Sequence, residues 1–296
     1  MDTAATGLEP IHSAHLIRRV DEKLIELLSA LEAHDWDLPT VAGSWKVRDV
    51  AAHLLDTALR KLSMARDRCF VEAAELHSHE DLVKLVNRLN AEGVAVYRRL
   101  SPAVLIDTMK MACEEVARFH EGQDPFASAT FAVSWAGEET SANWFDTARE
   151  LTERWHHQQQ IRLATNREGI MTPELYHPVL DCFVRGLPHA FRNVEGEEGC
   201  GIYLNISGEC GGQWYLVKAA GGWSLMSQPV QNPAAEVTVP QEIAWRVFTK
   251  GIGRDEALRR SVLRGRHDLA ETVFQLTAIV GVAQVSYLSR KRELAR

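Results

Sequence analysis

The chain has 296 residues, which allows one large domain or two domains of about 150 residues each. Apolar residues make up 46% and charged residues 25%, as is ordinary for a globular protein that buries a core without disulfides or a structural metal. Asp and Glu outnumber Lys and Arg by 40 to 33. The resulting charge of −7 argues against a general nucleic-acid binder, which needs a basic face.

The first part of the chain has the spacing of amphipathic helices. One apolar stripe runs along residues 12–33, where its members recur three or four positions apart: Leu16, Val20, Leu24, Leu27 and Leu31. Similar spacing predicts further helices over 45–70, 80–99, from Pro102 onward, and over 142–165. Residues 122–141 contain a proline and two glycines without a helical period, which indicates a long connection. Helices of this kind fit an all-α, up-down four-helix bundle.

Beyond Pro173 the pattern changes from helical to alternating. A helix is predicted near 174–190, and the Gly-rich segment after it has period two, with Ile202, Leu204 and Ile206 on one face. The segment AEVTVP predicts another short strand, and residues 240–250 and 254–281 return to helical spacing. Strands between helices indicate a small α+β domain. We therefore expect a helical bundle over residues 1–170 and an α+β domain over 171–296.

The remaining global features concern the compartment. No apolar run approaches the roughly 18 residues that span a bilayer. The first twenty residues lack the charged start and apolar stretch of a secretory signal. The five cysteines form no CxxC pair: Cys69, Cys113, Cys182, Cys200 and Cys210. A scattered, odd number is typical of reduced thiols, so the sequence predicts a cytoplasmic protein without a membrane partner.

The last predicted helix of the bundle carries a possible pair of metal ligands. Glu153 and His157 are four residues apart, so their side chains share one face of the helix and could bind a cation such as zinc. His156 follows Glu153 by three residues and is the nearest rival, although His157 lines up better with Glu153. Because such pairs also arise by chance, the spacing alone leaves a hydrogen-bonded surface pair as the alternative.

His53 is the third candidate, and it lies in an otherwise apolar stretch, VAAHLLDTAL. A histidine in such a stretch can be a satisfied core residue. Facing helices of a bundle can also bring it to Glu153 and His157, and three protein ligands would leave a fourth position open, as in catalytic zinc sites. Asp49 or Asp56 could orient His53 from behind, or could simply be solvated surface charges.

These residues carry a resemblance to a known family. The segment GSWKVRDVAAHLLD resembles the first signature of DinB-like metal-binding bundles, and more narrowly of the mycothiol-dependent maleylpyruvate isomerases. The segment WAGEETSANWFDTARELTERWHHQQQIRLA resembles that family's second signature. The stretch from GLPHAF through GQWYLV, GWSL and AWRVFTKG to LAETVFQLTAIVG is similar to the sterol-carrier-protein-like α+β domain fused behind the bundle. The resemblance covers nearly the whole chain and implies that His53, Glu153 and His157 are metal ligands.

The resemblance also implies a chemistry. In the family, a low-molecular-weight thiol adds to a conjugated cis double bond, the new single bond rotates, and elimination returns the trans isomer. The implied cofactors are a divalent metal (zinc, or nickel or another ion) and mycothiol or a similar thiol as co-substrate. An arginine from the C-terminal domain is expected to pair with the substrate's carboxylates. Arg246, Arg264 and Arg266 are the candidates, and a surface salt bridge is the alternative for each.

Other functions stay open at this stage. The same site could activate water in a metal-dependent hydrolase of thiol conjugates, and the chain could also be a non-catalytic, metal-binding stress-response module. No GxGxxG, GxSxG or Walker-type loop is present, so nucleotide cofactors and a serine-hydrolase mechanism are not supported. The sequence favours a thiol-using isomerase or S-transferase whose partners are a small-molecule substrate and the thiol, and leaves monomer and homodimer undecided.

Overall fold

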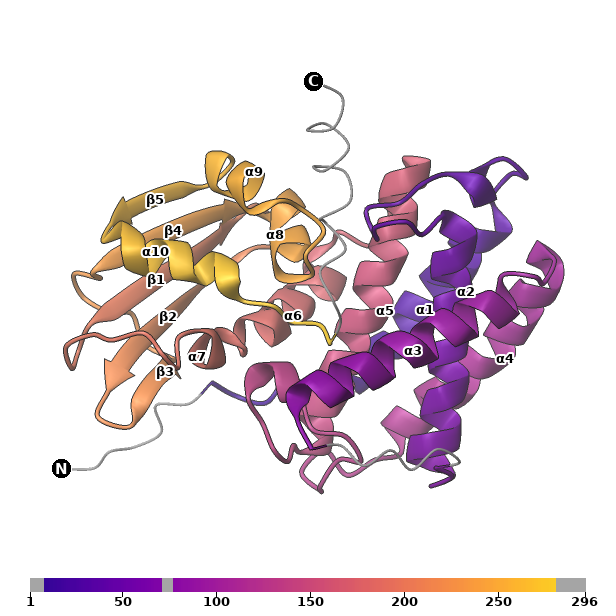
Figure 1. The fold of residues 1–296 in the computed structure, drawn as a ribbon, viewed down its shortest axis with the longest axis horizontal. Coiled ribbons are helices and arrows are strands. Elements are labelled where there is room, and N and C mark those ends of the chain that lie inside the picture. The colour runs from indigo at the N-terminus through magenta and orange to yellow at the C-terminus, as the bar shows by residue number, and fades with distance from the viewer. Residues whose placement is uncertain (1–7, 71–76, 281–296) are drawn as a thin grey trace. The chain divides into compact units, whose positions relative to one another are not determined.

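The structure is a computed structural model that describes residues 8–70 and 77–280, and its contacts divide the chain into two units (Figure 1). One unit is helical and consists mainly of His12–Ala132 and Thr140–Ile170. The other contains a sheet with helices and consists mainly of Val133–Glu139 and Met171–Ile279. The predicted fold class, a helical bundle followed by an α+β domain, is confirmed. No helix in the described part of the chain is long and apolar enough to cross a membrane.

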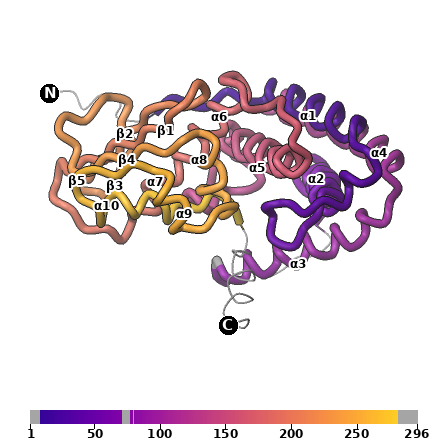
Figure 2. The backbone as a smooth tube through the Cα atoms, turned by 90° about the horizontal axis from the view of Figure 1, so that it is seen from above, coloured from indigo at the N-terminus to yellow at the C-terminus, as the bar shows by residue number. Residues whose placement is uncertain are grey.

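Among the residues that the structure describes, five helices build the first unit: α1 (Ala14–Ser29), α2 (Val47–Lys61), α3 (His79–Tyr97), α4 (Pro102–Glu121) and α5 (Asn143–Thr165). Helices α1 and α2 each pack against both α4 and α5, which closes a four-helix bundle. Helix α3 packs against α2 from outside this bundle (Figure 2). The bundle interior is made of apolar side chains that all four helices contribute, including Leu24, Leu28, Val50, Leu55, Met109 and Ile161.

Local sequence signals explain where these helices begin and end. Ser101 accepts a hydrogen bond from the main-chain N–H of Val104, and Pro102 occupies the first helical position of α4. Helix α2 is shorter than the predicted 45–70, because its last residue, Lys61, passes into a π-helical turn, Leu62–Arg66.

The second unit contains a five-stranded sheet with the order β3-β2-β1-β4-β5. Its strands are β1 (Gly201–Ser207), β2 (Gly212–Ala219), β3 (Gly222–Met226), β4 (Ala235–Pro240) and β5 (Val262–Gly265). The central pair, β1 and β4, is parallel, and the other pairs are antiparallel. Ile202, Leu204 and Ile206 are buried on one face of β1, as their alternation predicts.

Short helices accompany the sheet: α6 (Pro173–Val184), α7 (Leu187–Ala190), α8 (Gln241–Phe248), α9 (Arg254–Arg259) and α10 (His267–Thr272). The prediction of helical spacing throughout 254–281 is therefore wrong, because strand β5 separates α9 from α10. Strand β5 pairs with β4 at the sheet edge and is mostly exposed, so it lacks the alternation that marks a strand. Gly265 ends it at φ +74°, where a Cβ would lie 2.3 Å from the carbonyl oxygen of Ala234.

Candidate metal centre

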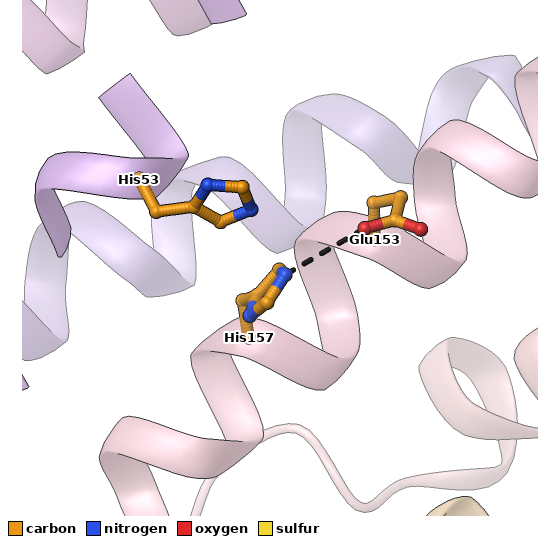
Figure 3. A group of neighbouring side chains, drawn as sticks. All are labelled: His53, Glu153 and His157. Carbon is orange, nitrogen blue, oxygen red and sulfur yellow. Dashed lines mark ion pairs between the residues drawn. The ribbon is translucent and has the colours of Figure 1, made fainter. Parts of the chain in front are cut away.

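The three predicted ligands come together inside the helical unit, His53 from α2 and Glu153 and His157 from α5 (Figure 3). One ligand atom from each residue lies within 4.8 Å of the other two. Nε2 of His157 is 3.6 Å from Oε2 of Glu153, and the two imidazole centroids are 4.6 Å apart. Ligand atoms around a tetrahedral zinc ion are about 3.4 Å apart. Small side-chain rotations would therefore place all three around one ion.

His157 is oriented by a residue that the sequence analysis missed. Its Nδ1 lies 2.8 Å from Oε1 of Gln160, one turn further along α5. Because the amide oxygen only accepts, Nδ1 carries the ring proton, and Nε2 faces Glu153 with its lone pair. Histidines that bind metals usually donate their second ring N–H to such an acceptor. The i,i+3 spacing of His157 and Gln160 is the signal that could have revealed this pair.

His53 presents a buried, neutral imidazole. Only 4% of the residue is exposed, and within the described residues its Nδ1 has no hydrogen-bond partner. The ring packs against both the indole of Trp45, with centroids 4.9 Å apart, and the ring of His157. Burial, and after it the neighbouring His157, holds the pKa of His53 well below its usual value. The neutral ring is the form that binds a metal.

Glu153 supplies the negative charge of the group. Burial alone would raise the pKa of its carboxyl, but the adjacent imidazole of His157, and after it that of His156, lower it below the usual value. The carboxylate is therefore ionised near neutral pH, and 27% of the side chain is exposed. Imidazoles and a carboxylate form a donor set that suits zinc and similar divalent ions, so the residues present fit such an ion.

His156, the rival ligand, lies beside the group, with its ring centroid 3.9 Å from that of His157, but it is not among the described residues whose ligand atoms converge. Nδ1 of His156 is 2.8 Å from the carbonyl oxygen of Thr152, and burial, with His157 next in importance, lowers its pKa to about 3. Asp49 accepts from the main-chain N–H preceding α2, and Asp56 pairs with Arg60 at 2.7 Å. Neither aspartate hydrogen-bonds His53. Both are buried, so they are not solvated surface charges either.

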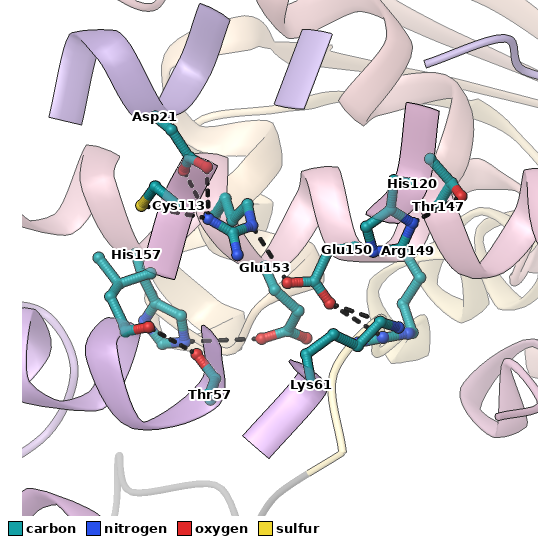
Figure 4. Close-up of polar contacts among 12 residues, drawn as sticks. Asp21, Thr57, Lys61, Cys113, His120, Thr147, Arg149, Glu150, Glu153 and His157 are labelled. Atoms are coloured by element: carbon teal, nitrogen blue, oxygen red, sulfur yellow. Dashed lines mark hydrogen bonds and ion pairs between the residues drawn. The ribbon is translucent and has the colours of Figure 1, made fainter. Parts of the chain in front are cut away.

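A buried ionic network lies along α5 beside the group (Figure 4). Lys61 lies 2.6 Å from Asp146 and 3.7 Å from Glu150, and Arg154 pairs with Asp21 at 2.6 Å and with Glu150 at 3.1 Å. Burial would raise the pKa of Glu150, but the charges of Lys61 and Arg154 hold it far below its usual value. The network connects α5 to α1 and α2, and so fixes the helix that carries Glu153 and His157.

The three candidate arginines all lie in the α+β unit, and each has a partner there. Arg246 donates to the carbonyl oxygen of Gly251 at 3.1 Å, and Arg266 pairs with Asp268. Arg264 lies 3.9 Å from Glu236. Their contribution to the site remains a prediction. None of the five cysteines forms a disulfide, and none joins the group formed by the described residues.

Comparison with known proteins relates this geometry to a family. Residues 17–162 match the model of the mycothiol maleylpyruvate isomerase N-terminal domain. This region is similar to that domain family. The match spans α1 to α5 almost completely, so all three residues of the group lie within the matched region.

Solved structures support the fold of a longer stretch. One is a mycothiol-dependent maleylpyruvate isomerase, with 13% identity and a TM-score of 0.50 over 81% of this chain and 88% of that chain. A mutant of a mycothiol-dependent maleylpyruvate isomerase gives 12% identity and a TM-score of 0.51 over 82% and 90%. At this identity the likeness establishes the fold. No significant match was found among curated protein sequences.

Proposed function

We propose that the protein is a divalent-metal-dependent enzyme that uses a low-molecular-weight thiol to isomerise, or to conjugate, a small electrophile. The observation that carries the proposal is the group of two imidazoles and one ionised carboxylate inside the region that matches the mycothiol maleylpyruvate isomerase N-terminal domain. Three protein ligands are typical of catalytic zinc sites, which keep one position for a reactant. The proposal places a thiol such as mycothiol at that position.

Each residue of the group has a distinct task. His53 and His157 would hold the ion as neutral ligands, and Gln160 keeps the Nε2 lone pair of His157 directed at it. Glu153 would offset one positive charge of the ion, and its partly exposed side chain leaves this side of the group accessible to a small molecule. A bound divalent ion would lower the pKa of a coordinated thiol and so supply a nucleophile at neutral pH.

The proposed isomerisation consumes nothing. Attack of the thiolate sulfur on a cis double bond conjugated to a carbonyl forms a C–S bond, and the electron pair of the double bond moves onto the carbonyl oxygen. The remaining carbon–carbon single bond rotates. Expulsion of the thiolate breaks the C–S bond and restores the double bond in the trans form. With an electrophile that has no such elimination route, protonation of the adduct would leave a stable conjugate, which is the S-transferase outcome.

Elemental analysis of the purified protein, combined with thiol titration with and without a chelator, tests the proposal. We expect one equivalent of a divalent ion, thiol binding that the chelator abolishes, and thiol-dependent isomerisation. His53→Ala should lose both metal and turnover, whereas His34→Ala, at an exposed histidine of the same unit, should retain both. Metal retained by His53→Ala, or thiol binding that the chelator leaves unchanged, would contradict the assignment. Hydrolysis of a thiol conjugate without added thiol would identify a hydrolase instead.

A further inference from the structure

The five-stranded sheet of the α+β unit leaves one of its faces open. The opposite face is covered, and its side chains, such as those of Ile202, Leu204 and Trp214, are buried. On the open face, every side chain that the described strands contribute is half-buried or exposed. Sheets with antiparallel strands can turn such a face to water, and polar residues then cover it. The composition of the face therefore indicates whether it is solvated or contacts a partner.

The open face is poor in charged residues. Within the strands that the structure describes, its only charged side chains are Glu236 and Arg264, in a chain of which 25% is charged. These two lie on neighbouring strands, 3.9 Å apart, and their opposite charges leave the face neutral. Uncharged side chains fill the rest of it, among them Tyr203, Tyr215 and Met226. Tyrosine and methionine are enriched at protein–protein interfaces, whereas lysine and acidic residues are depleted there.

One row of residues crosses the open face from edge to edge. Its members are paired from strand to strand, in the order Met226, Tyr215, Tyr203, Glu236 and Arg264. The rings of Tyr203 and Tyr215 stack in the middle of the row, with centroids 5.3 Å apart and an interplanar angle of 22°. Because stacking already restricts both rings, they lose little conformational entropy when a partner covers them.

We infer that the open face packs against the same face of a second copy of this chain. The charge of −7 makes two copies repel each other over most of their surface, whereas a neutral face lets them approach. Strand β1, which carries Tyr203, is the central strand of the sheet. A two-fold axis along β1 would bring the two copies of Tyr203 together and would place Glu236 of each copy opposite Tyr215 of the other. The tyrosine hydroxyl could then donate to the carboxylate, and no charge would meet its own copy.

The size of the face sets the strength of this dimer. Five strands that lie about 4.8 Å apart and are about 20 Å long give a footprint of roughly 500 Å² per copy. Two copies then cover about 1,000 Å², which is the lower end of the range for specific interfaces. We therefore expect a dimer that dissociates at micromolar concentrations.

Sedimentation velocity of the full-length protein tests the inference. Over a range from about 1 to 500 μM, the protein should change from monomer to dimer. Tyr203→Glu should weaken the association about a hundredfold or more, because two carboxylates would meet at the two-fold axis. Phe126→Glu is the matched control: it introduces the same charge at an aromatic side chain of the helical unit that is 66% exposed, and it should leave the dimer unchanged.

A mixture of two variants tests whether Tyr203 lies on the axis. Tyr203→Glu and Tyr203→Lys should each be monomeric alone, since like charges meet. Their equimolar mixture should form dimers, because each interface then pairs a carboxylate with an ammonium group, and loss of folding would not be reversed by mixing. A wild type that stays monomeric, a dimer that Tyr203→Glu leaves intact, or a mixture of the two folded variants without dimers would each overturn the inference. None of these measurements needs metal or thiol, so they are independent of the proposed function.

Discussion

A substitution of Gln160 tests whether this residue fixes the tautomer of His157 that a metal ion requires. In the wild type, Nδ1–H of His157 donates to Oε1 of Gln160 over 2.8 Å, and Gln160 is only 4% exposed. Gln160→Leu keeps the volume but removes the acceptor. Without metal, the ring of His157 can then move its proton to Nε2 and donate to Glu153. A metal would need that nitrogen and would force the proton back to Nδ1, where the variant offers no acceptor.

The free-energy cost of forcing the proton back to Nδ1 determines how much metal affinity Gln160→Leu should lose. A buried N–H without an acceptor costs about 1–3 kcal/mol, which corresponds to a roughly 5- to 150-fold weaker metal affinity. This range agrees with the 10–100-fold effects that are typical of residues behind metal ligands. The loss of metal affinity is measured by competition for zinc between the metal-free protein and a chelator of known zinc affinity. Gln160→Glu should restore wild-type affinity or improve on it, because a carboxylate also accepts from Nδ1–H.

Gln158 provides the matched control for the same substitution. It lies two residues away on α5 and is fully buried, and neither atom of its amide has a hydrogen-bond partner among the described residues. Gln158→Leu should therefore leave metal affinity unchanged and should not reduce the free energy of unfolding, because a buried unpaired amide is itself unfavourable. Wild-type affinity in Gln160→Leu, or an equal loss in Gln158→Leu, would refute the tautomer argument.

Three further predictions concern the stability of the fold. Arg154→Met should destabilise the protein by about 3–5 kcal/mol in urea unfolding, because it leaves the carboxylate of Asp21 buried without its cation. Arg118→Met, at an exposed arginine with two carboxylate partners, should cost less than about 1 kcal/mol, and equal costs would disprove the argument from burial. Burial, with the charge of Lys61 next, lowers the pKa of His120 to about 3, whereas an unfolded histidine has a pKa of about 6.5. The unfolded chain therefore binds more protons between these values, and stability should fall as the pH falls through this window. His120→Gln should reduce that slope in urea midpoints recorded from pH 7 to 4, and an unchanged slope would assign it to other groups. Gly265→Ala should destabilise the α+β unit by about 1 kcal/mol or more, through its positive φ and the close carbonyl oxygen, and an unchanged melting temperature would count against this strain.

The sequence by itself determined the architecture well where its patterns were strong. Long apolar stripes at helical spacing predicted the helices of the bundle, and the alternation of Ile202, Leu204 and Ile206 predicted β1. Those patterns are local, because each element must bury one face and the period of its apolar residues reveals which face. The exposed edge strand β5 buries little, so its residues carried no such pattern and it was mistaken for part of a helix.

For the candidate site, residue spacing within one helix predicted only the pair of Glu153 and His157, which share a face of α5. The meeting of His53 with this pair depends on the packing of α2 against α5, and spacing within one helix does not contain that information. The same holds for Gln160, whose role appears only once the ring of His157 has a direction. Side chains from different helices acquire a shared chemistry only when tertiary packing sets the distances between them.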